Sequence, residues 1–323
     1  MEKNKKLLLM LMGKRRKLAM TVTTTGAQTL TLQQITPDGG VCVVDWGDGT
    51  ANSTIANGNT GTTTHAYAGA GTWTVRISNP HLISVLDLRD SKIVFNSVFL
   101  RFCTTKLATL YLSGLSAGCT INSADMAHLR LTKTLYMYFT QAGTYAIDSG
   151  DFASYTLSYQ LYLHFQQAGT YSIDSTDFAS YTLSNQLLLY FSQAGTYAID
   201  SGDFASYTLS NTLTLYFNQT GTYTISRADW PYRRATSIQI EMGLSNTQVN
   251  AILLGLADSF ADRLVAGTKI DLLGNGNAAP TGAIEAPADP DIATWTAGNA
   301  AYELVNDTHG NSAFHWGAVE VAS

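Results

Sequence analysis

Gly143-Thr-Tyr-Ala-Ile-Asp-Ser-Gly-Asp-Phe-Ala-Ser-Tyr-Thr-Leu157 is the stretch of sequence that decides the fold, because the chain repeats it. It recurs almost unchanged from Gly169 and from Gly195, and its first residues recur from Gly221. The period is 26 residues. Self-similarity at a fixed period of about 20–50 residues is typical of proteins that stack one structural unit many times.

An apolar Leu-x-Leu pair, with Met or Ile in some copies, precedes each repeat and extends the array in both directions. The seven pairs are Leu86/Leu88, Leu110/Leu112, Leu135/Met137, Leu161/Leu163, Leu187/Leu189, Leu213/Leu215 and Ile238/Ile240. Apolar residues that alternate with outward ones at period two indicate strands. One repeat cannot bury its own apolar residues, whereas stacked repeats share a continuous core. We therefore predict a β-solenoid of about seven rungs, each of 24–26 residues, over residues 81–241.

Upstream of the array, residues 18–80 alternate in short strand-like runs around a tight turn, Asp45-Trp-Gly-Asp-Gly-Thr50. Glycines can adopt the positive φ that such a turn needs, and its aspartates can accept hydrogen bonds from nearby amides. A second motif, His65-Ala-Tyr67, leads into a strand that begins at Gly71. Together the two motifs resemble the PKD family of immunoglobulin-like domains. The resemblance covers about a fifth of the chain and implies a β-sandwich over residues 18–80.

Downstream of the array, Ser245 is a plausible N-cap for a helix. Val249, Ile252, Leu253 and Leu256 follow it at helical spacing. We predict that residues 242–283 form a helix and a last strand that cap the open end of the solenoid. Residues 284–323 are expected to form a C-terminal hairpin, with arms at 301–306 and 313–321.

The order of these segments is similar to leucine-rich-repeat-like proteins of tailed phages and prophages, often described as tail-fibre or virion structural proteins. Residues 81–283 carry that resemblance. The expected fold class is mainly β: a PKD/immunoglobulin-like β-sandwich followed by a leucine-rich-repeat-like β-solenoid with a helical cap. The resemblance implies a non-enzymatic component of the virion surface that contacts other virion proteins and forms homo-oligomers.

The charge is unevenly distributed along the chain. Residues 1–20 carry a net charge of +6, and the remainder carries −11. A nucleic-acid binder would spread basic residues over its folded surface, so we expect no nucleic-acid partner. The basic arm, residues 1–17, is predicted to anchor the chain on an acidic neighbour. Its cations are Lys3, Lys5, Lys6, Lys14, Arg15, Arg16 and Lys17.

The apolar run within this arm, Leu7–Met12, is short for a signal peptide, and Lys14 follows where a small-residue cleavage site should lie. No stretch of the sequence approaches 18 apolar residues, so we expect no membrane span. The three cysteines, Cys42, Cys103 and Cys119, fit buried thiols better than a disulfide framework or a zinc site.

Aromatic residues recur at the outward positions of the predicted strands. The candidate ligand-binding residues are Tyr136, Tyr138, Tyr162, His164, Tyr190 and Tyr216. Tyrosines are enriched at interfaces, so this face is a candidate surface for a host glycan or protein. The alternative is that neighbouring rings merely stack on one another and stabilise the sheet.

Acidic residues also recur, as Asp148/Asp174/Asp200 and Asp151/Asp177/Asp203. Calcium-binding β-helices use a nine-residue period, so we interpret these columns as caps of the intervening loops and expect no metal and no cofactor. The sequence has no His-x-x-x-His pair, nucleophile elbow or phosphate loop, and we predict no catalytic residues.

We therefore expect a non-enzymatic phage virion protein on the particle surface: a tail fibre, a spike or a capsid decoration that mediates attachment or assembly. A bacterial cell-surface adhesin built from the same modules is the main alternative. A glycan-degrading spike enzyme is a further alternative, disfavoured because an active site breaks the symmetry that the aspartate columns keep.

Overall fold

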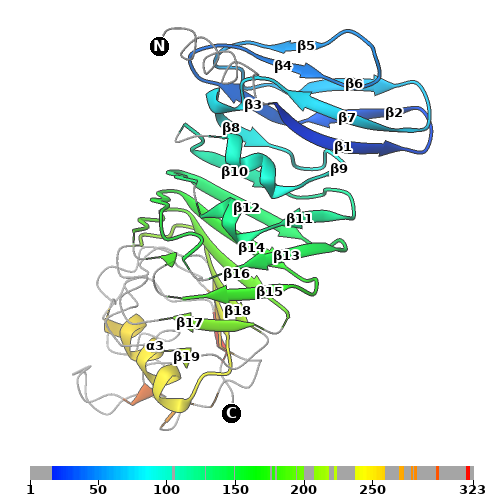
Figure 1. The fold of residues 1–323 in the computed structure, drawn as a ribbon. Coiled ribbons are helices and arrows are strands. Elements are labelled where there is room, and N and C mark those ends of the chain that lie inside the picture. Colours follow the sequence, from blue (N-terminus) through cyan, green and yellow to red (C-terminus); the bar gives the residue numbers. More distant parts are fainter. Residues whose placement is uncertain are drawn as a thin grey trace, which may run out of the picture. The chain divides into compact units, whose positions relative to one another are not determined.

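The computed structural model shows a mainly β protein that contains a β-solenoid (Figure 1). Its residues fall into two compact units: 1–131 with 141–143, and 132–140 with 144–323. The structure describes residues 17–103, 106–127, 129–148, 150–174, 177–178, 180–193, 195–199, 207–217, 222–223, 237–258, 269–272, 278, 280–281, 296–297 and 318–320.

The first unit begins with antiparallel strands. They are β1 (Leu18–Thr24), β2 (Gln28–Leu32), β3 (Gln34–Pro37), β4 (Cys42–Asp45), β5 (Ser53–Ile55), β6 (Thr63–Tyr67) and β7 (Gly71–Ile77). A five-stranded sheet has the order β5-β4-β7-β1-β9, where β9 is Ile93–Val94, and β2 pairs with β6 in a separate two-stranded sheet. Alternating burial along β1 and β4 places Met20, Val22 and Val44 in the core.

The first unit continues into two turns of parallel sheet. Its remaining elements are η1 (Pro80–Leu82), β8 (Ile83–Asp87), β9 (Ile93–Val94), η2 (Ser97–Phe102), β10 (Thr109–Leu112), β11 (Cys119–Ile121) and α2 (Ser123–Met126). β10 pairs with β8 in parallel, so the first two predicted Leu-x-Leu positions form strands in this unit.

Two pairings cross the boundary that the sequence predicts at residue 80. β3 pairs antiparallel with β8, and β1 pairs antiparallel with β9. The strands before residue 80 therefore belong to the same compact unit as the first two turns. β3 also covers the edge of β8, which would otherwise present unpaired backbone groups.

The second unit contains the repeated array. The strands β12 (Thr134–Phe139), β14 (Gln160–Phe165), β16 (Gln186–Phe191), β18 (Thr212–Phe217) and β20 (Ser237–Glu241) pair in parallel, each with the next. Each turn returns through a shorter strand of a second sheet, in β13 (Gly143–Ile147), β15 (Thr170–Ile173), β17 (Thr196–Ile199) and β19 (Thr222–Tyr223). Figure 1 shows these strands stacked in succession, and the solenoid has about five turns.

The register explains why the repeat folds in this way. Leu161 lies beside Leu187, which lies beside Leu213, so identical side chains meet in columns inside the solenoid. Phenylalanines form a second inner column: Phe165 stacks on Phe191 with ring centroids 5.5 Å apart. At about 1.5–3 kcal/mol for each large apolar side chain removed from water, such columns stabilise the stack.

The chain after the array contains α3 (Asn246–Asp258), β21 (Lys269–Asp271) and β22 (Ala318–Glu320). The helix begins directly after Ser245, as predicted, and the Gln248 side chain accepts hydrogen bonds from the Ser245 amide and hydroxyl. Its four predicted apolar residues are buried. β21 pairs in parallel with β20 and with β22. The first arm of the predicted C-terminal hairpin lies outside the described residues.

Candidate functional site

The candidate binding residues lie in two outer columns on the face formed by β12, β14, β16 and β18. The parallel register places Tyr136 beside Tyr162, which lies beside Leu188. In the neighbouring column the register brings together four residues in succession: Tyr138, His164, Tyr190 and Tyr216. All six predicted aromatic residues are therefore assembled on one face of the second unit, which we call the aromatic face.

The rings of the aromatic face stack on one another. The ring centroids of Tyr136 and Tyr162 are 4.1 Å apart, with an angle of 20° between the planes. His164 stacks on Tyr190 at 4.2 Å, and Tyr190 stacks on Tyr216 at the same distance. Each ring is only partly exposed. The ring faces thus contact their neighbours in the stack, and the polar edges are left as the groups that can meet a ligand.

The polar atoms of this face are also coupled. Burial raises the pKa of Tyr162, and the neighbouring Tyr136 hydroxyl, which shares a hydrogen bond with it, raises that pKa further. Burial, followed by the hydroxyl of Tyr216, has the same effect on the pKa of Tyr190. Burial lowers the pKa of His164 to about 4, so this imidazole is neutral at pH 7. Its Nε2 atom is buried without a hydrogen-bond partner.

Sequence reasoning missed Glu241, which continues the second outer column of the aromatic face on β20, and a separate pair in the first unit, Tyr111 with Arg89. Tyr111 lies on β10 beside Asp87, and the Arg89 guanidinium lies 4.4 Å from the centre of its ring. Glu241 lies beside Tyr216 and accepts a hydrogen bond from the Gln239 amide. Tyr111 lies between Leu110 and Leu112, so the Leu-x-Leu spacing could have found it. Glu241 differs in residue type from the column that it extends.

The Asp151 and Asp177 side chains cap and connect the loops, as the sequence interpretation proposed, whereas Asp200 and Asp203 lie outside the described residues. Asp177 Oδ1 accepts hydrogen bonds from the backbone amides of Gly150 and Phe152, one turn earlier, at 2.9 and 3.1 Å. Its Oδ2 accepts from the Asp174 amide in its own loop, and Asp151 accepts equivalently from the Asp148 amide. Among the described residues, no cluster of His, Cys, Asp and Glu has the geometry to hold a metal ion.

Burial has a marked effect on these carboxyl groups. It raises the pKa of Asp151 to about 7; the hydrogen bond from the Asp148 amide opposes this shift, and the charges of Asp148 and Asp177 add to it. Burial likewise raises the pKa of Asp177 to about 6, although three backbone amides oppose the shift. The two groups therefore titrate near neutral pH, well above an ordinary aspartate.

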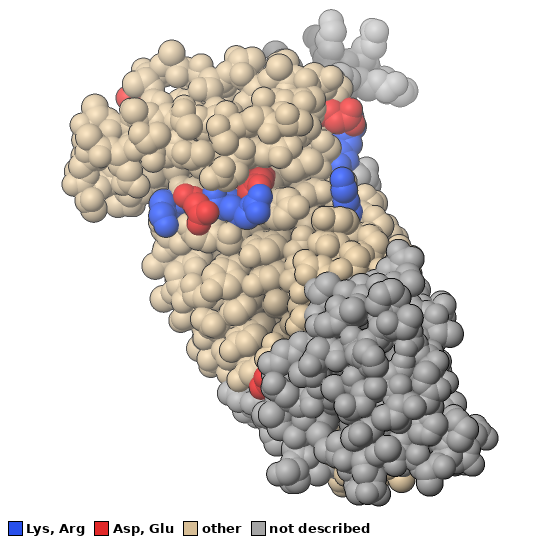
Figure 2. Space-filling model, turned by 180° about the vertical axis from the view of Figure 1, so that it is seen from behind, with Lys and Arg blue, Asp and Glu red and all other residues tan. Residues whose placement is uncertain are grey.

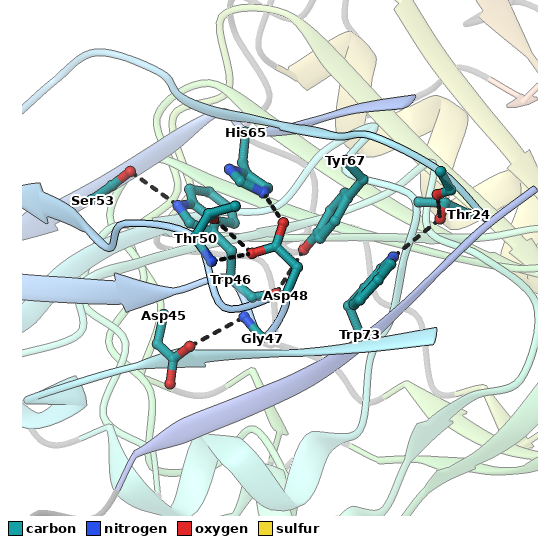
Figure 3. A network of polar contacts seen from close by, with 11 residues as sticks. Thr24, Asp45, Trp46, Gly47, Asp48, Thr50, Ser53, His65, Tyr67 and Trp73 are labelled. Carbon is teal, nitrogen blue, oxygen red and sulfur yellow. Dashed lines mark hydrogen bonds and ion pairs between the residues drawn. The ribbon is translucent and has the colours of Figure 1, made fainter. Parts of the chain in front are cut away.

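A second polar network surrounds the Asp45–Thr50 turn in the first unit (Figure 3). Gly47 and Gly49 have φ values of +82° and +80°, and the Asp45 side chain accepts from the Gly47 amide, as predicted. Asp48 accepts from the amide and hydroxyl of Thr50. A Cβ on Gly47 would lie 2.5 Å from a backbone oxygen, so this position also requires glycine for space.

The histidine of the His65-Ala-Tyr67 motif completes this network. His65 Nε2 lies 2.7 Å from Asp48 Oδ2, and its ring stacks on Trp46 at 4.8 Å. The Tyr67 hydroxyl donates to the Trp46 carbonyl (Figure 3). Burial acts to raise the pKa of Asp48, but hydrogen bonds from Thr50 and His65 outweigh it and hold this pKa at about 2. The two sequence motifs thus form one structural network that fixes the turn.

The basic arm lies outside the described residues except for Lys17, which is exposed. The three cysteines are free and buried, as the sequence suggested. Burial raises the pKa of Cys42 to about 11 and, with a further contribution from Cys42, that of Cys103 to about 12. Within the described residues, no helix is both long enough and apolar enough to span a membrane.

Figure 2 shows one face of the molecule, on which wide stretches of the described surface carry no Lys, Arg, Asp or Glu.

Comparisons with protein-family models, curated proteins and solved structures gave no match to this chain. The fold and the assembled residues define a β-solenoid protein with an aromatic strand face.

Proposed function

We propose that this chain is a non-enzymatic structural protein of a phage particle surface, where it acts as a tail fibre, spike or capsid decoration in attachment or assembly. The observation that carries the proposal is the aromatic face, six aromatic residues brought into register on one sheet. Tyrosine-rich surfaces are typical of recognition sites. The repeated solenoid is a rigid support for such a surface, because every turn is held by the same inner columns.

In this proposal the other segments serve presentation and assembly. Residues 18–80 form a PKD-like immunoglobulin sandwich, supported by the Asp48–His65 network and by two groups of antiparallel strands. Residues 242–283 cap the solenoid through α3, supported by the burial of its apolar side. The basic arm docks on an acidic neighbour in the particle, and the mature assembly is a homo-oligomer.

Immunogold electron microscopy of a producing culture tests this proposal. The antibody is raised against the full chain, and a culture in which its gene is deleted is the matched control. We expect gold on the outside of phage particles, at a position that distinguishes a fibre from a capsid decoration. Gold on cell envelopes beside bare particles would overturn the proposal and support a bacterial surface adhesin.

The role of the arm is tested separately by its incorporation into particles. One variant replaces the arm's seven cations, Lys3 to Lys17, by glutamine. A control variant replaces exposed Lys133 by glutamine. We expect the first variant to be depleted from purified particles and the control to be incorporated normally. Normal incorporation of both variants would contradict an electrostatic anchor.

A further inference from the structure

We propose that the aromatic face binds an uncharged, hydroxyl-rich polysaccharide that lies along the stack of strands. This inference rests on the proposed attachment function and deepens it by naming the class of ligand. It follows from the charge of the face, the area that its rings leave uncovered and the repetition of its polar groups.

The face carries no formal charge at pH 7 across β12, β14, β16 and β18. Between Lys133 and Arg227 the sequence contains no Lys, Arg or Glu. The described aspartates of this stretch follow the second strand of each turn rather than the strands of the aromatic face. His164 is neutral, because burial lowers its pKa to about 4. An acidic polymer would find no cation here, and a basic ligand would find no anion before Glu241 on β20.

The rings leave little exposed apolar surface that a protein partner could bury. The hydrophobic driving force is about 25 cal/mol for each Å² of apolar surface removed from water. On this face three ring pairs stack at centroid distances of 4.1–4.2 Å, Tyr138 contacts His164 at 4.5 Å with the planes tilted by 50°, and all the rings are only partly exposed. The interaction that remains available is hydrogen bonding, which favours a ligand rich in hydroxyl groups.

The hydrogen-bonding groups keep spare capacity in this arrangement. A phenol can donate one hydrogen bond and accept two. The hydroxyl pair formed by Tyr190 and Tyr216 therefore leaves one proton and several lone pairs for a ligand. On the same strands, the Gln160 amide donates to the Gln186 side chain at 2.8 Å and leaves further donors at the margin of the face.

The repetition of the face suits a polymer of identical units. Neighbouring parallel strands are separated by about 4.8 Å, so equivalent groups recur at this interval along the solenoid. A chain of identical sugars can present the same hydroxyls to successive turns. Individually weak contacts then add up, because each later contact forms at a high effective concentration.

A binding experiment with the purified full-length chain tests the inference. The probes are dextran, laminarin and galactomannan as neutral polysaccharides, and alginate and hyaluronan as acidic ones, each at low and at high salt. We expect retention of at least one neutral polymer with little dependence on salt, because no charge is involved. Exclusive binding of acidic polymers, binding that high salt abolishes, or retention of none of the five would overturn the inference.

The variant with Tyr138→Phe, Tyr190→Phe and Tyr216→Phe identifies the surface. It keeps the stacked rings and removes only the hydroxyl groups, so the melting temperature should change little. The affinity for the retained neutral polymer should fall at least about tenfold. Tyr159→Phe is the matched control, since Tyr159 is 43% exposed and lies outside both columns. Equal affinities of the triple variant and the control would overturn the assignment to this face.

The test of the ligand class is independent of whether the chain is found on phage particles or on cell envelopes. A chain that is found on particles but binds no neutral polysaccharide overturns only the ligand class. A chain that is found on cell envelopes and binds a neutral polysaccharide through these tyrosines overturns only the virion assignment. Capture of a host protein through the same tyrosines, without any polysaccharide, would also refute the ligand class.

Discussion

The two units of the molecule bury their carboxylates in opposite ways. In the first unit, fully buried Asp125 accepts hydrogen bonds from Arg101 and Ser97, and Asp48 is held by His65 and Thr50. In the second unit, Asp151 and Asp177 are buried and bond to backbone amides. Among the described residues, neither of these two carboxylates forms an ion pair with a basic side chain.

Repetition explains the difference. Asp125, Asp151 and Asp177 follow one another at the repeat interval of 26 residues, so they are equivalent positions of the sequence repeat. In a near-identical array, the neighbour of a buried aspartate in the next turn is another aspartate. The first unit departs from the repeat and carries Arg101 in the turn before Asp125. Symmetry thus supplies the hydrogen bonds between turns, but it cannot supply an opposite charge.

The largest predicted effect is a loss of stability on substitution in the core of one unit, which tests whether the two units unfold independently. Phe165 is fully buried between Phe139 and Phe191 in the second unit. Phe165→Ala should destabilise that unit by about 3–5 kcal/mol. Hydrogen-exchange mass spectrometry should show lost protection in β12–β18 and unchanged protection in β1–β7. Phe95→Ala in the first unit is the matched reciprocal variant, and loss of protection in both units from either change would show that they unfold together.

The next effect is the response of the second unit to pH. Because the folded-state pKa values of Asp151 and Asp177 are raised to about 7 and about 6, the folded state holds more protons than the unfolded state above pH 4. The contribution of these two carboxyl groups to the stability of the second unit is fully present below about pH 4 and is lost as the pH rises through 6 to 7. Allowing for solvent screening, we expect a loss on the order of 1–2 kcal/mol between pH 5 and pH 8.

The first unit supplies the internal control for this experiment. The pKa of Asp48 is depressed to about 2, so its contribution to stability is present above about pH 4 and is lost as the pH falls through 2. Urea titrations at several pH values, each followed by an exchange pulse at one fixed pH, resolve both units. An increase in the stability of the second unit from pH 5 to pH 8 would refute the raised pKa values of its two buried aspartates.

A smaller effect is expected when the first unit is made to resemble the second. Arg101→Gln removes the cation beside Asp125 and leaves a buried carboxylate with neutral partners. The Arg101 side chain is about half exposed, so the cost should be on the order of 1–2 kcal/mol at pH 7, below that of a fully buried pair. The control is Arg130→Gln, which removes an exposed cation that donates hydrogen bonds only to backbone carbonyls. Equal stability of both variants would show that the Arg101 pair contributes nothing measurable.

Much of this fold could be predicted from the sequence, because repetition amplifies a local pattern. Strands form at the predicted Leu-x-Leu positions, although β8 ends at Asp87 and the solenoid has about five turns rather than the predicted seven rungs; the helix starts after Ser245. The first compact unit extends to residue 131, and the pairings of β3 with β8 and of β1 with β9 cross the predicted boundary at residue 80. Such long-range pairings leave no periodic signal in the sequence.

The candidate site was predictable to the same extent. Alignment of the repeats gave all six aromatic residues, since side chains in one column follow from the period alone. The missed Tyr111 lies in a repeat of slightly different length. The raised pKa values of Asp151 and Asp177 could not be predicted, because they depend on which side chains surround a group after folding.

The smallest predicted effect concerns the one residue that interrupts the tyrosine column. His164 has a buried Nε2 atom without a hydrogen-bond partner, and an unsatisfied buried polar atom costs free energy. His164→Tyr would continue the stack from Tyr138 to Tyr190 and remove that atom. We expect the second unit to gain up to about 1 kcal/mol at pH 7, measured by urea unfolding.

The same variant sharpens the pH comparison. The pKa of His164 is lowered to about 4, so the folded state holds fewer protons at this site than the unfolded state between about pH 4 and pH 6.5. Its contribution to stability therefore increases with pH and partly offsets the two aspartates. His164→Tyr removes this opposing effect, so stability should fall more steeply from pH 5 to pH 7 than in the unmodified chain. Parallel curves for the two proteins would mean that the imidazole is not buried in the neutral form.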